Sequence, residues 1–288
     1  MATIDPLQIL QEDLSQPDVE VAIQAIRRLR TIALALGPEA TRTRLIPCLM
    51  SYGGFLAAQD IEFKQDKVVS DECLTEIAIQ LAHFVPLVGG ASNSESLVDL
   101  VEKLATSAET CIRTGLVESL KTIIPEMARN DPSTVEALLL PMLKHIVEEE
   151  GFAGKCTAAG MCPIVYPFVA DAGLRAAVRE IFLICCNDDT PIIRKCAYEN
   201  IGNMVRVVGS EAANAQFGPI LIHLRAENQE NLRLLCVDAA IQMAPGISEI
   251  DFKELCFPLA HSACQDSSWR VRKKLAKVFF QMLLFLSF

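Results

Sequence analysis

Apolar residues recur along this chain at the spacing expected of helices. In Val19–Leu36 and in Trp269–Leu284, apolar side chains return every three or four positions and so share one face of a helix. Ile192–Val208 and Asn231–Met243 have the same pattern. No segment alternates apolar and polar residues over the length of a strand, and no Asn-Gly or Asp-Gly pair marks a hairpin. The sequence therefore predicts an all-α protein.

The helical segments recur with a period of 39 residues. Cations lie one period apart at Lys155, Arg194, Arg233 and Arg272, and a step of 42 leads back to Arg113. An acid lies six residues before each of the four cations that share the exact period; these acids are Glu149, Asp188, Glu227 and Asp266. Because acid and cation recur together, we expect neighbouring repeats to present them to each other as a ladder of structural ion pairs. A period of this length is typical of stacked helix pairs.

Seven repeats follow from this period, each with two helices. Their bounds are 1–37, 38–89, 90–130, 131–169, 170–208, 209–247 and 248–288. A proline inside the first helix of several repeats predicts a kink there. One helix pair cannot bury both of its faces, whereas like pairs stacked in register can. We therefore predict an α-α superhelix, a solenoid that forms a single domain over 1–288.

The second repeat contains an insertion near 51–66, between its two helices. Its position makes it project from the edge where the turns inside the repeats lie. Surface loops tolerate such insertions well. A mobile loop is the favoured interpretation, and a segment that modulates the choice of partner is the alternative.

The composition excludes several classes of function. The net charge of −10 and the pI of about 5.0 argue against general nucleic-acid binding. No apolar run approaches the roughly 20 residues of a membrane-spanning helix, so no membrane contact is expected. The 11 cysteines lie in apolar stretches, and no secretory signal is apparent. They predict reduced core thiols in a cytoplasmic or nuclear protein, in preference to a disulfide framework.

The sequence contains no recognisable catalytic motif. Gly-x-Gly-x-x-Gly, the Walker loop, Gly-x-Ser-x-Gly and His-Glu-x-x-His are all missing. His261 and Cys264 are spaced to share a metal ion, but no further ligands lie nearby in sequence, which favours ordinary core or surface positions. The carboxylates of Glu148–Glu150 favour a solvated turn over a catalytic dyad. We predict a protein that is not an enzyme and that needs neither a cofactor nor a metal.

The period, the proline in the first helix and the acid–arginine pair in the second resemble the HEAT repeat. Several separate segments, in order and spacing, resemble more closely the scaffold (A, or 65-kDa regulatory) subunit of protein phosphatase 2A. These segments are Leu29–Gly37, Val85–Gly90, Val117–Leu120, Cys186–Pro191 and Ser267–Arg272. The resemblance runs from about residue 5 to residue 280 and covers the first seven of the family's fifteen repeats.

The resemblance implies a non-catalytic scaffold. In that family the early repeats hold a variable (B-type) regulatory subunit, whereas the late repeats hold the catalytic subunit. We therefore expect the chain to bind a B-type subunit through the turns inside its repeats, and to bind the catalytic subunit only if further C-terminal repeats are present. A HEAT-repeat adaptor of another complex, for transport or assembly, is the alternative. An enzyme is disfavoured because the catalytic motifs are missing.

The resemblance also assigns candidate contact residues on the row of turns inside the repeats, which we call the docking edge. They are Glu109, Phe152, Asp188, Asp189, Thr190, Pro191, Arg194, Lys195, Ser268, Trp269 and Arg270. Two positions depart from the family. Ala108 replaces the first acid of an acidic pair that ends at Glu109, and Phe152 stands near the place of a turn tryptophan.

Trp269 is the only tryptophan of the chain and begins a predicted helix on the docking edge. Tryptophan and arginine are frequent anchors of protein interfaces, which favours a contact role for Trp269 and Arg270. The alternative is that Trp269 only packs on the neighbouring repeat. The cations Lys273, Lys274 and Lys277 favour a solvated flank over a nucleic-acid site.

The last helix is apolar on nearly all sides over Phe279–Phe288. A terminal repeat of a solenoid ordinarily has a polar outer face. We therefore expect the chain on its own to self-associate through this face; aggregation and docking onto another surface are the alternatives.

Overall fold

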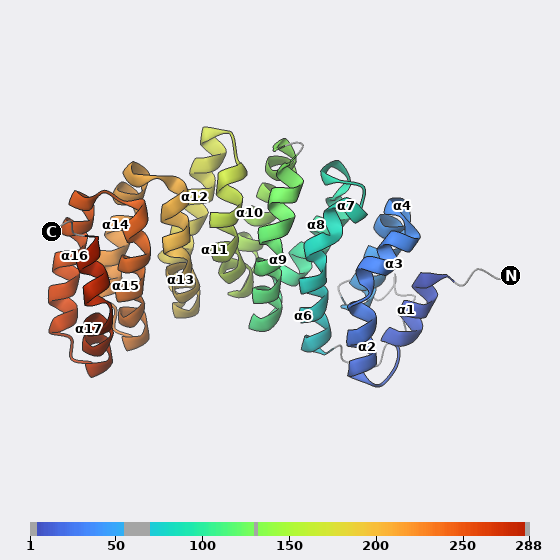
Figure 1. Ribbon diagram of the computed structural model, residues 1–288, viewed down its shortest axis with the longest axis horizontal. Coiled ribbons are helices and arrows are strands. Elements are labelled where there is room, and N and C mark those ends of the chain that lie inside the picture. Colours follow the sequence, from blue (N-terminus) through green and yellow to red (C-terminus); the bar gives the residue numbers. More distant parts are fainter. Residues whose placement is uncertain (1–4, 55–69, 130–131, 286–288) are drawn as a thin grey trace. The chain divides into compact units, whose positions relative to one another are not determined.

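The computed structural model describes residues 5–54, 70–129 and 132–285, and it is helical without any strand in these ranges. The prediction of an all-α superhelix is confirmed (Figure 1). The chain divides into two compact units. Unit 1 comprises Met1–Thr157 and Phe168–Leu174, and unit 2 comprises Ala158–Pro167 and Arg175–Phe288. The single domain over 1–288 stays a prediction.

Unit 1 begins with two short helix pairs. Its elements up to residue 93 are α1 (Pro6–Leu14), α2 (Val19–Ile26), α3 (Leu29–Leu36), α4 (Pro38–Ala40), the π-helical turn Thr41–Leu45, α5 (Ile46–Tyr52), α6 (Asp71–Gln80), α7 (Phe84–Leu87) and the 3₁₀ turns Leu81–His83 and Ala91–Asn93. Longer helices follow as α8 (Glu95–Ala105), α9 (Thr110–Ala128) and α10 (Leu140–Glu148), and α11 (Ala153–Val165) starts in this unit. The predicted insertion near 51–66 lies mostly outside the described residues.

Unit 2 continues with longer helices. After the end of α11 and the 3₁₀ turn Tyr166–Phe168 it contains most of α12 (Ala172–Cys186), then α13 (Pro191–Val208), α14 (Ser210–Arg225), α15 (Glu230–Met243), the 3₁₀ turn Ala244–Gly246, α16 (Glu249–Cys264) and α17 (Trp269–Leu284). No helix in the described ranges combines the length and apolarity needed to cross a bilayer.

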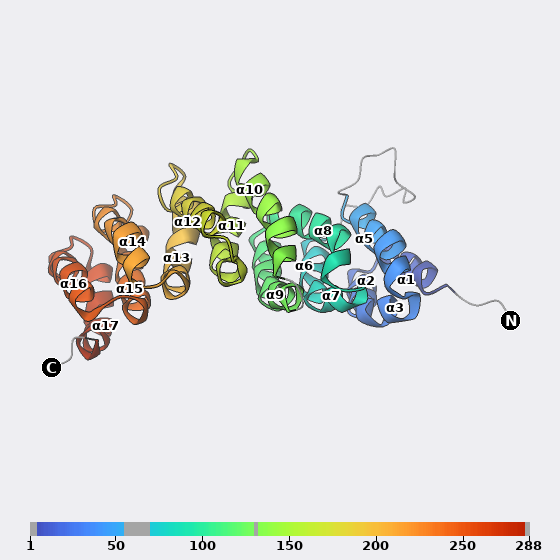
Figure 2. The same cartoon turned by 90° about the horizontal axis from the view of Figure 1, so that it is seen from above.

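Each unit has two layers of helices. In unit 2 the second helices of the repeats pack on one another, α13 on α15 and α15 on α17, and the first helices pack as α14 on α16. In unit 1 the corresponding contacts join α2, α6 and α9 in one layer and α5, α8 and α10 in the other. Figure 2 shows the two rows within unit 2 from above. Stacking of like elements therefore buries the apolar faces, as the period predicts.

Short polar caps start several of these helices. The Asp18 carboxylate accepts a hydrogen bond from the Glu20 N–H at 3.0 Å, and the Ser268 hydroxyl accepts one from the Arg270 N–H at 3.1 Å. Such bonds satisfy N–H groups that lack a partner inside the helix. One predicted helix differs. Val19–Leu36 is divided into α2 and α3, because the Arg28 N–H turns to the carbonyl of Ala25 and tightens the backbone between them.

Proline is accommodated in two ways. In unit 1, Pro47 and Pro141 each follow a π-helical turn, Thr41–Leu45 and Val135–Leu139. A π turn widens the helix and shifts the hydrogen-bond register, which fits a residue that has no N–H. In unit 2, α14 and α16 continue through Pro219 and Pro258. The predicted distortion of the first helices therefore has a defined location in unit 1, whereas kinks in α14 and α16 stay a prediction.

Most of the described cysteines lie in the apolar core. Ten described cysteines are free thiols, and seven of these are buried. In unit 2 the rings of Phe182 and Phe217 meet edge to face with centroids 5.7 Å apart. Burial raises the pKa of the Cys236 thiol to about 12, so this side chain stays neutral and acts as a small apolar residue.

The predicted ladder is present in unit 2. The Arg194 guanidinium donates to both carboxylate oxygens of Glu227, at 2.8 and 3.2 Å, and Arg233 donates in the same way to Asp266, at 2.8 and 3.1 Å. Each arginine also donates to two backbone carbonyls of its own turn, for example those of Glu227 and Asn228 in the case of Arg233. Each ladder arginine therefore ties its own turn to the turn of the next repeat.

The ladder is interrupted in unit 1, where Arg113 does not pair with Glu149. The Arg113 guanidinium donates to the carbonyls of Ser107 and Ala108, both at 2.6 Å, and to the Thr110 hydroxyl at 3.2 Å. The Phe152 ring lies 5.5 Å from its guanidinium carbon. A cation–π contact thus replaces the predicted ion pair at this step.

We expect the Asp266–Arg233 pair to make stability depend on pH. The hydrogen bond from Arg233, with a further bond from the Ser268 N–H, lowers the pKa of Asp266 below its ordinary value of 3.8. A carboxyl whose pKa is lowered by folding stabilises the fold above its unfolded pKa and loses that contribution as the pH falls through the folded pKa. Denaturant unfolding of wild type and Asp266→Asn should therefore differ most at neutral pH.

The difference in unfolding free energy should shrink as the pH is lowered below about 4, near the unfolded pKa of aspartate. Glu249→Gln, which loses an exposed contact to Lys253 within one helix, is the control and should show a much smaller difference at neutral pH. If the difference in unfolding free energy between wild type and Asp266→Asn stayed constant from neutral to acid pH, the role assigned to the Asp266–Arg233 pair would be contradicted.

Candidate docking edge

Two turns in unit 2 repeat the same local geometry. The Thr190 N–H donates to Asp188 Oδ1 at 2.8 Å, and the Ser268 N–H donates to Asp266 Oδ1 at 2.8 Å. Aspartate favours such turns because its side chain reaches the backbone two residues on. In both cases the chain is extended at Thr190 or Ser268 and enters a helix at the next residue. The sequence thus fixes the direction in which each helix begins.

The ladder places these turns on one edge of unit 2. Arg194 connects the turn before α13 to Glu227 in the turn before α15, and Arg233 connects that turn to Asp266 before α17. Figure 1 shows the α14–α15 and α16–α17 turns at the lower edge of unit 2. The predicted alignment of turns is therefore present in this unit.

The candidate residues before α13 divide into exposed and structural groups. Asp189, Thr190 and Lys195 are exposed, and Pro191 at the first position of α13 is half-buried. Asp188 is half-buried and closes the turn. The Arg194 side chain is only 16% exposed because it belongs to the ladder. The exposed side chains of this turn are thus available to a partner. Arg194 holds the turn in place through its hydrogen bonds to the carbonyls of Asp188 and Asp189.

Trp269 is the most prominent apolar side chain of the docking edge, with 58% of its surface exposed. The cationic groups of Arg270 and Lys273 lie 5.9 and 5.4 Å from its ring centroid. Arg270 also reaches Glu230 of the preceding repeat at 3.2 Å. Because most of the indole faces solvent, Trp269 contributes little to the packing of α17 and is free to contact another molecule.

Sequence reasoning missed Glu230, which holds Arg270. Glu230 lies 39 residues before Trp269 and so occupies the equivalent place at the start of α15. The period could have revealed it, since Arg270 follows that place by one residue in the next repeat. Glu230 therefore orients the arginine beside the exposed indole.

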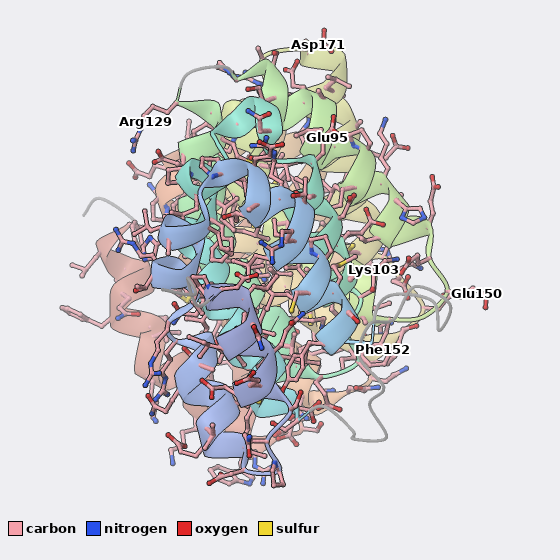
Figure 3. All side chains as sticks on the ribbon, turned by 90° about the vertical axis from the view of Figure 1, so that its right-hand side faces the viewer. Glu95, Lys103, Arg129, Glu150, Phe152 and Asp171 are labelled. Atoms are coloured by element: carbon pink, nitrogen blue, oxygen red, sulfur yellow. The ribbon has the colours of Figure 1, made fainter. Side chains whose placement is uncertain are left out.

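In unit 1 the candidate residues lie in two separate turns. Glu109 is exposed and immediately precedes α9. Phe152 lies in the turn between α10 and α11 and is 37% exposed. Figure 3 shows Phe152 and Glu150 away from Arg129 and Asp171, which lie in loops between repeats. Phe152 thus covers Arg113 with one face of its ring and keeps part of its surface available.

A close approach of two helices shapes the Phe152 turn. A Cβ atom on Gly154 would lie 2.0 Å from the Ile146 carbonyl oxygen, so only glycine fits between α10 and α11. Gly151 has φ of +110°, a conformation that other residues rarely adopt. These two glycines let the chain reverse within Glu149–Phe152 and set the Phe152 ring against Arg113.

Helix pairs stacked in both units, with ladder arginines in unit 2, make this chain a HEAT-repeat protein. Among solved structures the fold resembles the karyopherin Kap121p bound to Pho4p, with a TM-score of 0.65 at 11% identity over 98% of this chain and 34% of the karyopherin. It also resembles Cex1p, with a TM-score of 0.52 at 12% identity over 97% of this chain and 52% of Cex1p. At such low identity these likenesses concern the fold alone. No family model matches the sequence.

Similarity to curated relatives identifies the family of this chain within the class of HEAT-repeat proteins. The chain is 32% identical, over 88% of its length, to a probable serine/threonine-protein phosphatase PP2A regulatory subunit of Caenorhabditis elegans. It is 35% identical over 72% to the serine/threonine-protein phosphatase PP2A 65 kDa regulatory subunit of Drosophila melanogaster. It is also 29% identical over 96% to the A-type regulatory subunit of protein phosphatase PP2A from Schizosaccharomyces pombe. The chain belongs to the family of the regulatory A subunits of protein phosphatase 2A.

The chain spans 40%, 32% and 44% of the length of these three relatives, in the same order. All three are named regulatory subunits and not catalytic ones. The prediction that this chain is not an enzyme agrees with those names and with its scaffold fold.

Proposed function

We propose that the chain is a scaffold segment of a protein phosphatase 2A-type complex and binds a B-type regulatory subunit through its docking edge. The alignment of the unit 2 turns by the Arg194–Glu227 and Arg233–Asp266 pairs is the observation that carries this proposal. The pairs fix the spacing of consecutive turns, so a partner meets several turns at set distances. Rigid presentation of this kind lowers the entropy lost on binding.

The chemistry of the edge supports a protein partner. An exposed indole beside two cations, followed along the edge by the exposed acid Asp189, offers an apolar anchor within a polar surround. Interfaces commonly concentrate their binding energy in such aromatic and arginine anchors. Glu109 and Phe152 extend the proposed contacts into unit 1.

Binding of purified components tests the proposal. Isothermal titration of the 288-residue chain with a B-type subunit should give a saturable 1:1 complex. Titration with the isolated catalytic subunit should give none, because its binding is assigned to repeats beyond those present here. Binding of the catalytic subunit when no B-type subunit is present would contradict this assignment. The karyopherin likeness is one of fold and does not favour a transport adaptor.

We also propose that the isolated chain self-associates through α17 and its neighbour α16. Phe280, Leu284 and Ile250 are 71%, 70% and 70% exposed, and Phe279 is 48% exposed. Light scattering over a dilution series should show mass that rises with concentration, because association removes this apolar surface from water. Phe280→Glu/Leu284→Glu should stay monomeric. A wild-type chain that is monomeric at high micromolar concentration would contradict the proposal.

A cytoplasmic and nuclear location is part of the same proposal, because the family's role and the reduced cysteines suit those compartments. Imaging of the tagged 288-residue chain tests it, and accumulation in a secretory compartment would contradict it.

A further inference from the structure

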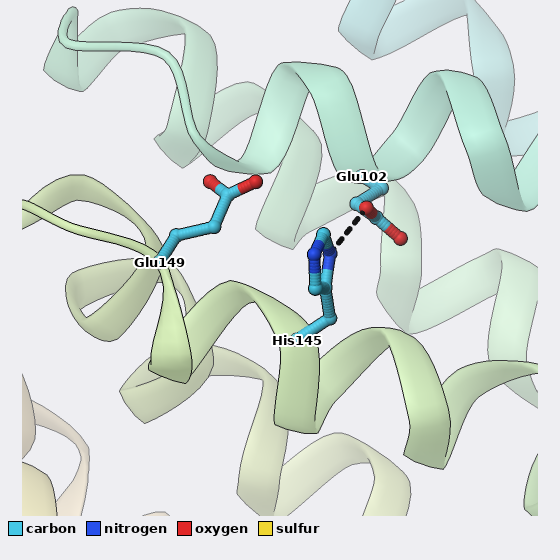
Figure 4. Close-up of side chains that lie close together, drawn as sticks. All are labelled: Glu102, His145 and Glu149. Carbon is cyan, nitrogen blue, oxygen red and sulfur yellow. Dashed lines mark hydrogen bonds and ion pairs between the residues drawn. The ribbon is translucent and has the colours of Figure 1, made fainter.

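A cluster of metal-ligating side chains lies on the face formed by α8 and α10, outside the candidate contact residues. The ligand atoms of Glu102, His145 and Glu149 all lie within 4.8 Å of one another. His145 Nδ1 is 2.7 Å from Glu102 Oε1. Figure 4 shows the three side chains gathered between the two helices. Two carboxylates and an imidazole are thus already close enough to share one ion.

The fold brings these residues together from two repeats. His145 and Glu149 are four residues apart, so they lie on the same face of α10, and Glu149 is the residue at which the chain leaves that helix. Glu102 belongs to α8, which packs against α10. The backbone of two packed helices therefore fixes the spacing of the cluster.

The Glu149 carboxylate is available to bind an ion because the ladder is interrupted at this step. In unit 2 the equivalent acids, Glu227 and Asp266, are held by arginines. Here Arg113 bonds to its own turn and stacks on Phe152. Within the described residues the half-buried Glu149 carboxylate has no hydrogen-bond or ion-pair partner. A half-buried carboxylate without a partner is costly, and a bound cation would offset this cost.

The surroundings favour a cation. A groove of about 430 Å³ adjoins the cluster and is lined by Glu95, Asp99, Glu102 and His145 together with apolar side chains, without a lysine or arginine. Glu95, Asp99 and Glu102 follow one face of α8. Converging carboxylates attract cations from solution and lower the cost of dehydrating them in a partly buried site.

We propose that Glu102, His145 and Glu149 bind a divalent transition-metal ion, with Zn²⁺ as the preferred species. The imidazole favours zinc over magnesium and calcium, which prefer ligands made wholly of oxygen. Three protein ligands leave a fourth tetrahedral position for water or for a group from another molecule. The site lies beside the Phe152 turn, so the metal would join α8 to α10 near the docking edge.

Zinc titration of the untagged chain is the experiment. Cys111 and Cys264 are exposed thiols that would also take zinc, so the measurements use the Cys111→Ser/Cys264→Ser background, with circular dichroism to confirm folding. Calorimetry should give one zinc per chain, and magnesium and calcium should give no comparable binding. His145→Ala and Glu149→Gln should each weaken zinc binding by about tenfold or more, since even the loss of an outer-shell group has effects of that size.

Two neighbouring acids serve as matched controls. Glu148→Gln and Glu150→Gln change exposed carboxylates next to the cluster and should leave the zinc affinity unchanged. Cobalt substitution should give weak visible bands typical of nitrogen and oxygen ligands, without intense thiolate bands. The proposal is overturned if the Cys111→Ser/Cys264→Ser protein does not bind zinc in the micromolar range. It is equally overturned if adding His145→Ala to that background leaves zinc binding unchanged, or if magnesium competes on equal terms.

Discussion

Replacing Trp269 with alanine should weaken binding of a B-type regulatory subunit by about 2 kcal/mol or more, which is roughly thirtyfold in the dissociation constant. The indole is 58% exposed and lies on the docking edge beside Arg270 and Lys273. A large aromatic ring that is solvent-exposed in the free chain loses its hydration when a partner covers it. Burial of the ring contributes favourable free energy to binding, and this contribution disappears when the ring is removed.

The fold should tolerate the Trp269→Ala change. Helicity and the melting temperature should remain close to wild type, because α17 is held mainly by its buried residues Val271, Leu275 and Met282. Ile222→Ala is the matched control, since Ile222 is 56% exposed on α14 but lies outside the turns. It should bind as wild type does. Intact binding by Trp269→Ala would refute the anchor role, and a lower melting temperature with intact binding would favour packing on the neighbouring repeat.

Replacing Arg233 with methionine should destabilise the chain by about 3 kcal/mol. The Arg233 side chain is only 16% exposed, and its loss removes two hydrogen bonds to Asp266 and two to backbone carbonyls. Asp266, which is 10% exposed, then keeps its charge but loses both hydrogen bonds from Arg233. Methionine retains most of the apolar stem, so the loss measures the guanidinium contacts and not packing.

Urea unfolding followed by circular dichroism measures the effect of Arg233→Met. Lys253→Met provides the control, because its pair with Glu249 is exposed on both sides, and its cost should stay within about 1 kcal/mol. A cost for Arg233→Met no greater than that of the control would mean that the ladder contributes little to stability.

The ladder and the docking edge could be predicted because their signals repeat. Arg194, Arg233 and the acids that hold them recur in one register, and helices stacked in phase must bring such positions together. The same reasoning failed at Arg113, where the pattern predicts an ion pair with Glu149 and the structure has a cation–π contact with Phe152. At this one step the arginine has a different partner, and a periodic pattern carries no information about a single repeat.

Other features depend on geometry that a linear pattern does not contain. The division of Val19–Leu36 into α2 and α3 arises from one tightened turn at Arg28. The π turns before Pro47 and Pro141 shift the register only locally. The Glu102–His145–Glu149 cluster joins residues 43 positions apart on different helices, and its members look like ordinary surface residues in sequence. Contacts between repeats, unlike the repeats themselves, require the packed structure.

Hydrogen–deuterium exchange of the chain with and without a B-type subunit measures most directly whether the turns inside the repeats contact the partner. The proposed function predicts slower exchange on binding in 187–195 and 266–271, with smaller changes at 107–110 and 150–153, and little change at the loops between repeats such as 209–211 and 246–249. Slower exchange confined to those inter-repeat loops, or none in the turns at saturating partner, would contradict it.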